Sequence, residues 1–189
     1  MGSKPKLPPG QRAIAETRKI NLGHNPPFDP ESWDLEVTGL VESPLKLSWD
    51  EFKGRVDYHG KSDLHCVEGW SVLDIEWEGV RLSTLLEQAG VKPEARFVFV
   101  ESDDGYSTSF PLSDADEADV VLVIKQNGEW LTPDEGRPVR LVVPHRYAYK
   151  AAKFVRRIVL VAEDRPGYWE TRGYHNEADP WKEQRKAPG

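Results

Sequence analysis

The sequence predicts a mixed α+β domain in which β-strand outweighs helix. Runs rich in Val, Ile and Phe, bounded by Asp, Gly and Pro, are typical of strands, and only two short segments have helical spacing. Asn127-Gly128, next to a β-rich run, predicts a hairpin with a tight turn. The chain contains no repeats and no glycine-rich phosphate loop. We therefore expect mixed β-sheets with short helices.

The first part of the chain is expected to be extended. Residues 1–10 and 25–30 are rich in proline, which fixes its own backbone φ and disfavours helix at the preceding residue. We therefore expect residues 1–20 to form an extended N-terminal arm wrapped on the domain. In residues 33–41 apolar and polar residues alternate, which predicts a half-buried strand ending near Gly39.

Two short helices are expected. Ser48-Trp49-Asp50-Glu51 has the pattern of a capping box, so a helix should begin there. Ser83 or Thr84 is expected to open the second helix, because the apolar residues around it fall on one helical face. Gly90 is expected to end it, since glycine readily adopts the left-handed conformation at a helix C-terminus.

Strands and an aromatic tail are expected after the second helix. The predicted strands cover residues 96–101, 120–125, 139–143 and 158–162. Residues 167–189 are polar but contain four aromatic side chains, too many for a disordered tail. We expect this tail to pack on the domain or on a partner, so that residues 21–189 form a single domain.

Composition narrows the class of protein. The chain has 189 residues, enough for one well-buried core, and a formal net charge of -7. This charge argues against sequence-independent binding to nucleic acid or to an anionic membrane surface. The 30% of charged residues also disfavours a membrane span. Residues 1–10 contain neither the apolar region of a secretory signal nor a twin arginine, so we expect a cytoplasmic protein.

Cys66 is the single cysteine of the chain. It cannot form an internal disulfide, and the several nearby Cys or His residues of a zinc site are absent around it. A buried structural thiol is the commonest role for such a residue. The flanking His65 and Glu68, with a tight loop expected at Gly69-Trp70-Ser71, leave two alternatives: a nucleophile, or a ligand to a metal completed by a cofactor.

A basic segment follows the third predicted strand. Within residues 136–154, an apolar strand leads into a loop with several cationic or titratable side chains, in a protein that is acidic overall. This segment is either a solvated basic face or an anion-binding pocket, because Arg and Lys are the usual phosphate-binding residues. Lys150 and Lys153 share a face if the segment is helical.

These segments combine into an ordered set of motifs. The set is Cys66-Val67-Glu68-Gly69-Trp70-Ser71, Trp77-Glu78-Gly79-Val80, Leu85-Leu86, Asp104-Gly105-Tyr106, the run from Gly136 to Pro144 containing Gly136-Arg137-Pro138-Val139-Arg140, and Lys150-Ala151-Ala152-Lys153-Phe154. Together these motifs resemble the molybdopterin domain of the sulfite oxidase family, in particular its small haem-free bacterial members of the MsrP type. The resemblance extends over residues 21–181 and implies that family's molybdopterin-binding fold.

The resemblance implies a molybdenum oxidoreductase, with molybdopterin as cofactor and Cys66 as the protein's ligand to molybdenum. A soft thiolate suits a transition metal whose other ligands come largely from the pterin. Carried over position by position, the implied cofactor contacts are Asn21, His24, Asn25, Ser102, Arg140, Lys150 and Lys153. His65, Glu68 and Asp104 are the candidate proton donors or acceptors, because oxygen-atom transfer to water requires protons.

Some positions depart from the family pattern. Glu135 and Ala148 stand where MsrP-type proteins often have Asn and Gly. Sulfite-oxidising members have arginines after their cysteine and a C-terminal dimerisation domain, whereas Val67-Glu68-Gly69 follows Cys66 here and the chain stops at Gly189. Glu68 would also repel a small anion. A sulfoxide, N-oxide or similar small substrate is therefore expected, and sulfite is less expected.

Other functions remain open at this stage. The chain contains no Cys-x-x-Cys-His, iron–sulfur cysteine set or nucleotide motif, so electrons should come from a separate electron-transfer partner. One alternative is a molybdopterin-binding module without turnover. The other is a metal-free redox enzyme that uses the Cys66 thiol, although the chain contains no resolving cysteine.

Overall fold

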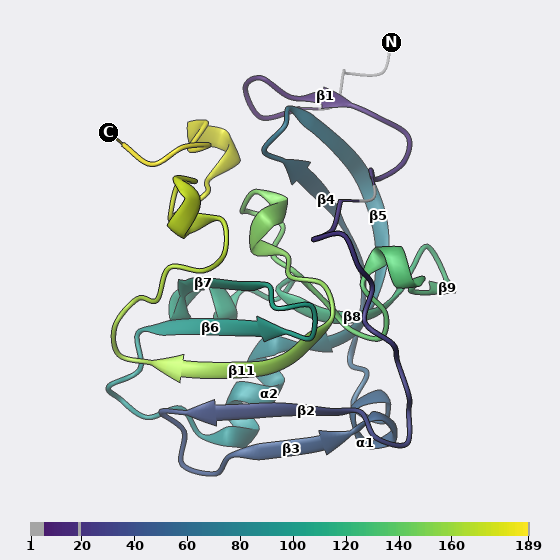
Figure 1. Ribbon diagram of the computed structural model, residues 1–189, viewed down its shortest axis with the longest axis vertical. Coiled ribbons are helices and arrows are strands. Elements are labelled where there is room, and N and C mark those ends of the chain that lie inside the picture. Colours follow the sequence, from purple (N-terminus) through teal and green to yellow (C-terminus); the bar gives the residue numbers. More distant parts are fainter. Residues whose placement is uncertain (1–5, 19, 189) are drawn as a thin grey trace.

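A computed structural model describes residues 6–18 and 20–188. Two mixed β-sheets and two short α-helices form the domain (Figure 1). This confirms the predicted α+β class. Residues 1–5, Lys19 and Gly189, which belong to the predicted arm and tail, lie outside the described residues.

One sheet carries a long hairpin. Its strands are β1 (Arg12–Ala13), β4 (Tyr58–Cys66), β5 (Trp70–Arg81), β8 (Val121–Gln126), β9 (Glu129–Trp130) and β10 (Arg140–Val142). The order is β1-β5-β8-β10, with β4 paired to β5 and β9 to β8, and the β1–β5 pair is parallel. The hairpin of β4 and β5 runs along one side of the molecule (Figure 1). The tight turn predicted at Asn127-Gly128 joins β8 to β9.

The other sheet lies across the lower part of the molecule in Figure 1. Its strands are β2 (Asp34–Gly39), β3 (Leu45–Ser48), β6 (Phe97–Ser102), β7 (Ser107–Pro111) and β11 (Val155–Val161), in the order β3-β2-β11-β6-β7. β11 is parallel to β2 and antiparallel to β6. The strand predicted to end near Gly39 is confirmed as β2.

The two helices begin differently. α1 (Trp49–Lys53) has the predicted capping box: the Ser48 hydroxyl accepts from the Glu51 backbone N–H, and the Glu51 carboxylate accepts from the Ser48 backbone N–H at 2.8 Å. α2 (Leu82–Ala89) begins at Leu82 without a side-chain cap, so the expectation that Ser83 or Thr84 opens it was wrong. Thr84 donates instead to the Asp57 carboxylate at 2.5 Å. Gly90 ends α2 with φ +69°, as predicted.

Several strands were not predicted. The sequence prediction missed β1, β3, β4, β5 and β7. Trp70 and Ser71, expected in a loop, are the first residues of β5, and the turn covers residues 67–69. The polar residues of β4 pair with β5 across a long antiparallel register, a tertiary contact that local propensity does not contain.

The apolar core has two main parts. The larger cluster contains the buried face of α2 and inward residues of both sheets, such as Leu85, Val98 and Ile158. Burying each such side chain contributes about 1.5–3 kcal/mol. A second cluster lies under the hairpin and includes Cys66, Trp77 and Ala151. The hairpin is therefore anchored close to the single thiol.

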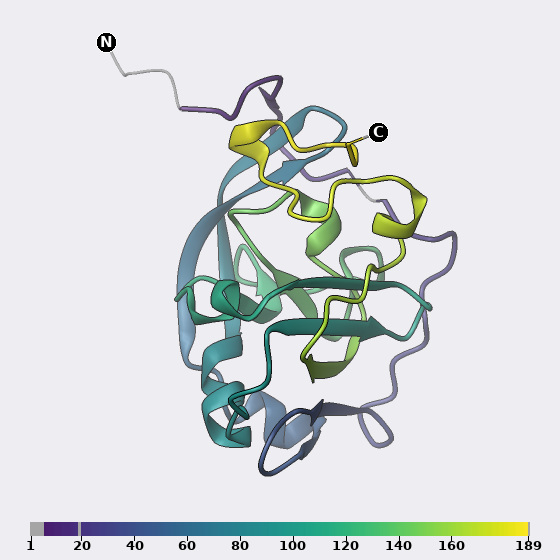
Figure 2. The ribbon, with the colours of Figure 1, turned by 90° about the vertical axis from the view of Figure 1, so that its left-hand side faces the viewer.

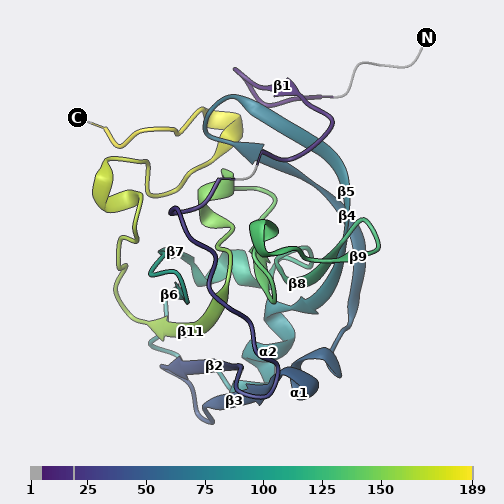
Figure 3. The same ribbon diagram turned by 45° about the vertical axis from the view of Figure 1, so that its right-hand side comes forward.

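β1 and the described part of the C-terminal tail lie near the turn of the hairpin. β1 and the C-terminal segment occupy the same end of the molecule (Figure 2), and residues 20–33 run from there toward α1 (Figure 3). Short 3-10 turns lie at Leu112–Asp116, Pro133–Glu135, Ala148–Lys150, Glu170–Arg172 and Pro180–Lys182. The last two belong to the aromatic tail, which packs on the domain.

Candidate functional site

A pocket of about 360 Å³ opens beside the turn of the β4–β5 hairpin. Its walls come from the N-terminal arm, the hairpin, the β6–β7 turn, β10 with the loop after it, and the C-terminal tail. The predicted site residues that line it are Asn21, Cys66, Glu68, Asp104, Arg140 and Lys153. Segments far apart in the sequence thus bring six of the predicted residues into one cavity.

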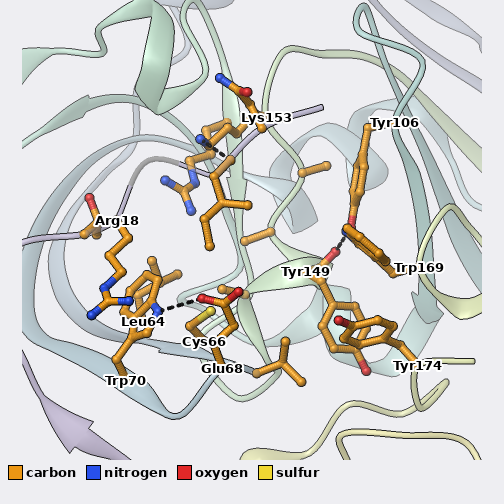
Figure 4. Close-up of a pocket in the computed structure, with 18 of the residues that line it drawn as sticks. Arg18, Leu64, Cys66, Glu68, Trp70, Tyr106, Tyr149, Lys153, Trp169 and Tyr174 are labelled. Carbon is orange, nitrogen blue, oxygen red and sulfur yellow. Dashed lines mark hydrogen bonds between the residues drawn. The ribbon is translucent and has the colours of Figure 1, made fainter. Parts of the chain in front are cut away.

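Cys66 is the last residue of β4, and its thiol lies in the pocket wall (Figure 4). Gly69, with φ +92°, reverses the chain and donates its backbone N–H to the Cys66 carbonyl at 3.0 Å. Gln11 of the arm donates to the same carbonyl at 3.0 Å. The turn and the arm therefore fix the position of the sulfur.

Cys66 is 6% exposed. Burial raises its pKa to about 11, and a hydrogen bond from the Glu68 backbone N–H opposes this pKa shift. The metal-free thiol is therefore protonated near neutral pH and is a poor nucleophile. A metal ion would have to displace this proton. Among the described residues, no group of three His, Cys, Asp or Glu could hold a metal, so its other ligands must come from a cofactor.

Two cations occupy another part of the wall. Arg140, the first residue of β10, is buried, and its Nε has no hydrogen-bond partner among the described residues. Burial lowers the pKa of Arg140 to about 10. Burial and then the charge of Arg140 lower the pKa of Lys153 to about 8. Since burying unpaired charge is costly, this pair fits an anionic group such as a phosphate.

Lys153 also ties the arm to the pocket. Its ammonium donates to the Ile20 carbonyl at 2.7 Å and to the Asp134 carbonyl at 2.5 Å. Asn21, next in the chain, donates through its amide to the Asn25 side chain at 2.9 Å, and Asn25 donates to Asp134 at 2.8 Å. Asn21 therefore lines the pocket, while Asn25 supports it from outside the lining.

Two carboxylates lie in the pocket. The Glu68 carboxylate points into it and accepts from the Trp70 indole N–H at 3.4 Å (Figure 4). Asp104, in the β6–β7 turn, accepts from the Tyr106 backbone N–H at 3.1 Å. Burial raises the pKa of Asp104 despite that hydrogen bond. Both groups are placed where they can exchange protons with bound molecules.

His24, His65 and Ser102 lie outside the lining, as Asn25 does. His65 faces away from Cys66, as neighbours in a strand do, and its Nδ1 lies 2.8 Å from the Ser71 hydroxyl. His24 is exposed. The hydroxyl of Ser102, at the end of β6, is buried without a described partner beside a charged surface groove. Their predicted roles stay predictions.

Lys150 is also outside the lining, although the resemblance implies that it contacts the cofactor. It is fully buried, and its ammonium lies 2.5 Å from the Glu170 carboxylate and donates to the Ser109 carbonyl at 2.7 Å. The loop forms a 3-10 turn that ends at Lys150, which gives Lys150 and Lys153 different surroundings. In this structure Lys150 holds the tail.

The sequence prediction missed part of the lining. Arg18, Trp70, Tyr149, Trp169 and Tyr174 all contribute side chains to the pocket. The aromatic content of the tail indicated that it packs, but gave no information about where. Tyr106 belongs to a motif that carried the family resemblance, which was the available signal for its position.

Comparison with known proteins defines the family. Residues 22–169 match the oxidoreductase molybdopterin binding domain family. The chain belongs to this family. This range contains Cys66, Arg140 and Lys153, whereas most of the arm and tail lie outside it.

Several relatives share this domain. The chain is 42% identical over 181 residues to the oxidoreductase YuiH of Bacillus subtilis, covering 95% of this chain and 91% of YuiH. It is 32% identical over 160 residues to the catalytic subunit of the protein-methionine-sulfoxide reductase MsrP of Gluconobacter oxydans, covering 75% of this chain and 51% of that protein. The chain therefore spans about half the length of this MsrP relative.

A solved structure agrees with the fold. The sulfane dehydrogenase SoxCD of Paracoccus pantotrophus superposes with a TM-score of 0.68 at 28% identity, covering 74% of this chain and 40% of that one. The predicted sulfite oxidase-type molybdopterin-binding fold is thus confirmed, as is membership of a family of molybdopterin-dependent oxidoreductases. Within residues 6–18 and 20–188, no helix is long and apolar enough to cross a membrane.

Proposed function

We propose that this protein reduces a small organic sulfoxide or N-oxide at molybdenum held by molybdopterin and Cys66. For a sulfoxide, the reaction consumes two protons and two electrons and yields one sulfide and one water: the S–O bond breaks, sulfur is reduced and the oxygen leaves as water. The observation that carries the proposal is the buried Cys66 thiol in a pocket that also contains Arg140 with an unpaired Nε.

The residues present fit the cofactor. Cys66 would supply a thiolate ligand. When bound, molybdenum supplies the two-electron redox change that accompanies oxygen-atom transfer. Arg140 and Lys153 would bind the anionic end of the pterin, and that anion would offset the cost of burying their charges. Asn21, which directly follows the arm, would contribute a polar contact.

Protons are needed to release oxygen as water. Glu68 carries its carboxylate in the pocket near Cys66, and Asp104 has its pKa raised by burial. We assign Glu68 to the substrate side and Asp104 to the cofactor side, because Lys153 acts on the pKa of Asp104. His65 would act through Ser71 and the β4–β5 hairpin and not by direct contact.

The direction and the electron supply follow from chemistry and relatives. Reduction is supported by the names of relatives that are methionine-sulfoxide reductase catalytic subunits. The electrons would come from a separate redox protein, because the chain has no haem-attachment or iron–sulfur motif. A cytoplasmic location remains a prediction, which cell fractionation of the native protein tests.

Turnover tests this function directly. The molybdenum-loaded protein is given a chemically reduced viologen dye and methyl phenyl sulfoxide, and the sulfide formed is quantified. One sulfide for every two electrons is expected from the wild type and from Ser113→Ala, an exposed control. Absence of sulfide and of amine from an N-oxide, with full molybdenum occupancy, would reject the proposed reaction.

A further inference from the structure

The pocket has an aromatic side built largely by the C-terminal tail. Tyr149, Trp169 and Tyr174 line it, and we call these three residues the aromatic wall. The rings of Tyr149 and Tyr174 meet edge to face at 5.3 Å, and those of Trp169 and Tyr174 lie 5.0 Å apart. Tyr174 lies beyond residue 169, where the family match ends. Part of the wall therefore lies outside the range that defines the family.

The wall is fixed by a buried polar anchor. The Lys150 and Glu170 side chains, 1% and 2% exposed, pair at 2.5 Å, and the Thr108 hydroxyl donates to Glu170 at 2.7 Å. The Tyr149 hydroxyl donates to the His175 carbonyl at 2.5 Å. Glu170 directly follows Trp169, so its contacts with Lys150 and Thr108 tie this part of the tail to the domain. The aromatic wall is thus preformed.

The wall faces the reacting end of the pocket. Figure 4 shows Tyr149 and Tyr174 on the side opposite Arg18 and Trp70, with Cys66 and Glu68 between the two sides. Lys153 lies at the other end of the pocket in the same view. In this view the wall lies at the same end of the pocket as Cys66 and Glu68 and away from Lys153.

We propose that the aromatic wall and Glu68 form the substrate subsite, for an uncharged or cationic sulfoxide or N-oxide that carries an apolar substituent. This inference rests on the proposed function. Aromatic rings bind alkyl groups, aryl groups, sulfur and organic cations. The Glu68 carboxylate repels anions at short range, which disfavours inorganic oxyanions and carboxylated analogues.

Binding to the molybdenum-loaded protein tests the subsite without turnover. Isothermal titration compares methyl phenyl sulfoxide with 4-(methylsulfinyl)benzoate, which keep the same sulfoxide group and differ in charge. The neutral compound should bind at least about tenfold more tightly to the wild type. Glu68→Gln should reduce that difference, because it removes the repulsion of the carboxylate.

Two wall variants test the rings. Trp169→Ala and Tyr174→Leu should each raise the Kd of methyl phenyl sulfoxide about fivefold to tenfold. Trp130→Ala removes an exposed tryptophan outside the lining and should leave that Kd unchanged. Molybdenum content and circular dichroism are measured for each variant, and Tyr174→Leu carries the test if Trp169→Ala does not fold.

The outcomes separate the subsite from the reaction. Selective binding that the wall variants weaken, in a protein that reduces no oxide, would reject the proposed reaction and support the subsite. Equal binding of the neutral and anionic compounds, or an unchanged Kd in Tyr174→Leu, would overturn the subsite even if sulfoxides are reduced.

Discussion

The hairpin around Cys66 and the two chain ends contribute to the same pocket in different ways. Cys66 and Glu68 lie within one turn, inside the range matched by the family, and their spacing is visible in the sequence. The arm and tail reach the pocket through contacts such as Gln11 to Cys66 and Lys150 to Glu170, which join distant residues. The proposed metal ligand and the carboxylate near it are thus close together in the sequence. The side chains proposed to surround the substrate depend on the packing of the arm and tail on the domain.

The largest effect is expected at the hairpin. Cys66→Ser should lose most of the bound molybdenum and lower the rate of sulfoxide reduction more than about 100-fold, because a hydroxyl is a far poorer ligand than a thiolate. Molybdenum per protein and steady-state rates measure this. A variant with full molybdenum occupancy and a normal rate would contradict the assignment of Cys66.

The anchor of the tail gives the next largest effect. Lys150→Met leaves Glu170 charged and buried without its partner, so the free energy of unfolding should fall by about 3–5 kcal/mol. Lys150→Met with Glu170→Leu should recover most of this loss and retain molybdenum. Urea denaturation and metal analysis measure both. A stable double variant without molybdenum would instead make Lys150 a cofactor contact, as the family resemblance implies.

Arg140 separates cofactor binding from stability. Arg140→Met should reduce molybdopterin occupancy about 10-fold to 100-fold, because a contact to the anion is lost. The cofactor-free variant should be as stable as the wild type or more stable by about 1 kcal/mol, since a buried charge with an unpaired Nε is removed. Arg140→Lys is the matched control. A clear fall in the stability of cofactor-free Arg140→Met would show that Arg140 supports the fold.

The smallest effect concerns pH and Lys153. Folding lowers the pKa of Lys153 to about 8 from its usual value near 10.5. Below pH 8 Lys153 is charged in both the folded and the unfolded protein, so the folded protein bears the full free-energy cost of burying that charge. As pH rises from 8 toward 10.5 the folded state loses the proton first, so cofactor-free protein should gain stability, by at most about 3 kcal/mol.

Chemical denaturation at pH 7.5 and pH 9.5 measures this gain, with Lys153→Met as the comparison. The variant should show a smaller rise, because Lys150, whose pKa is also lowered by burial, still contributes. An equal rise in both proteins would assign the pH dependence to groups other than Lys153.

Local patterns were predictable because local contacts determine them. The capping box at Ser48, the hairpin turn at Asn127-Gly128 and the cap at Gly90 each depend on residues within one turn. The prediction that Cys66 and Arg140 share one pocket came from the family resemblance and not from periodicity.

Long-range contacts were not predictable. β4 is polar along much of its length and is a strand because it pairs with β5. The alternation of Glu76, Trp77 and Glu78 was a usable signal for β5. Nothing near Glu170 indicates that Lys150 is its partner, because that contact forms only when the tail packs on the domain.

The most direct test of the central claim is X-ray absorption at molybdenum in the loaded protein. We predict that molybdenum in the wild type has one more sulfur neighbour than molybdenum bound to the Cys66→Ser protein. The comparison uses the fraction of the variant that still contains molybdenum. The same number of sulfur neighbours in both proteins would contradict the claim that Cys66 binds the metal.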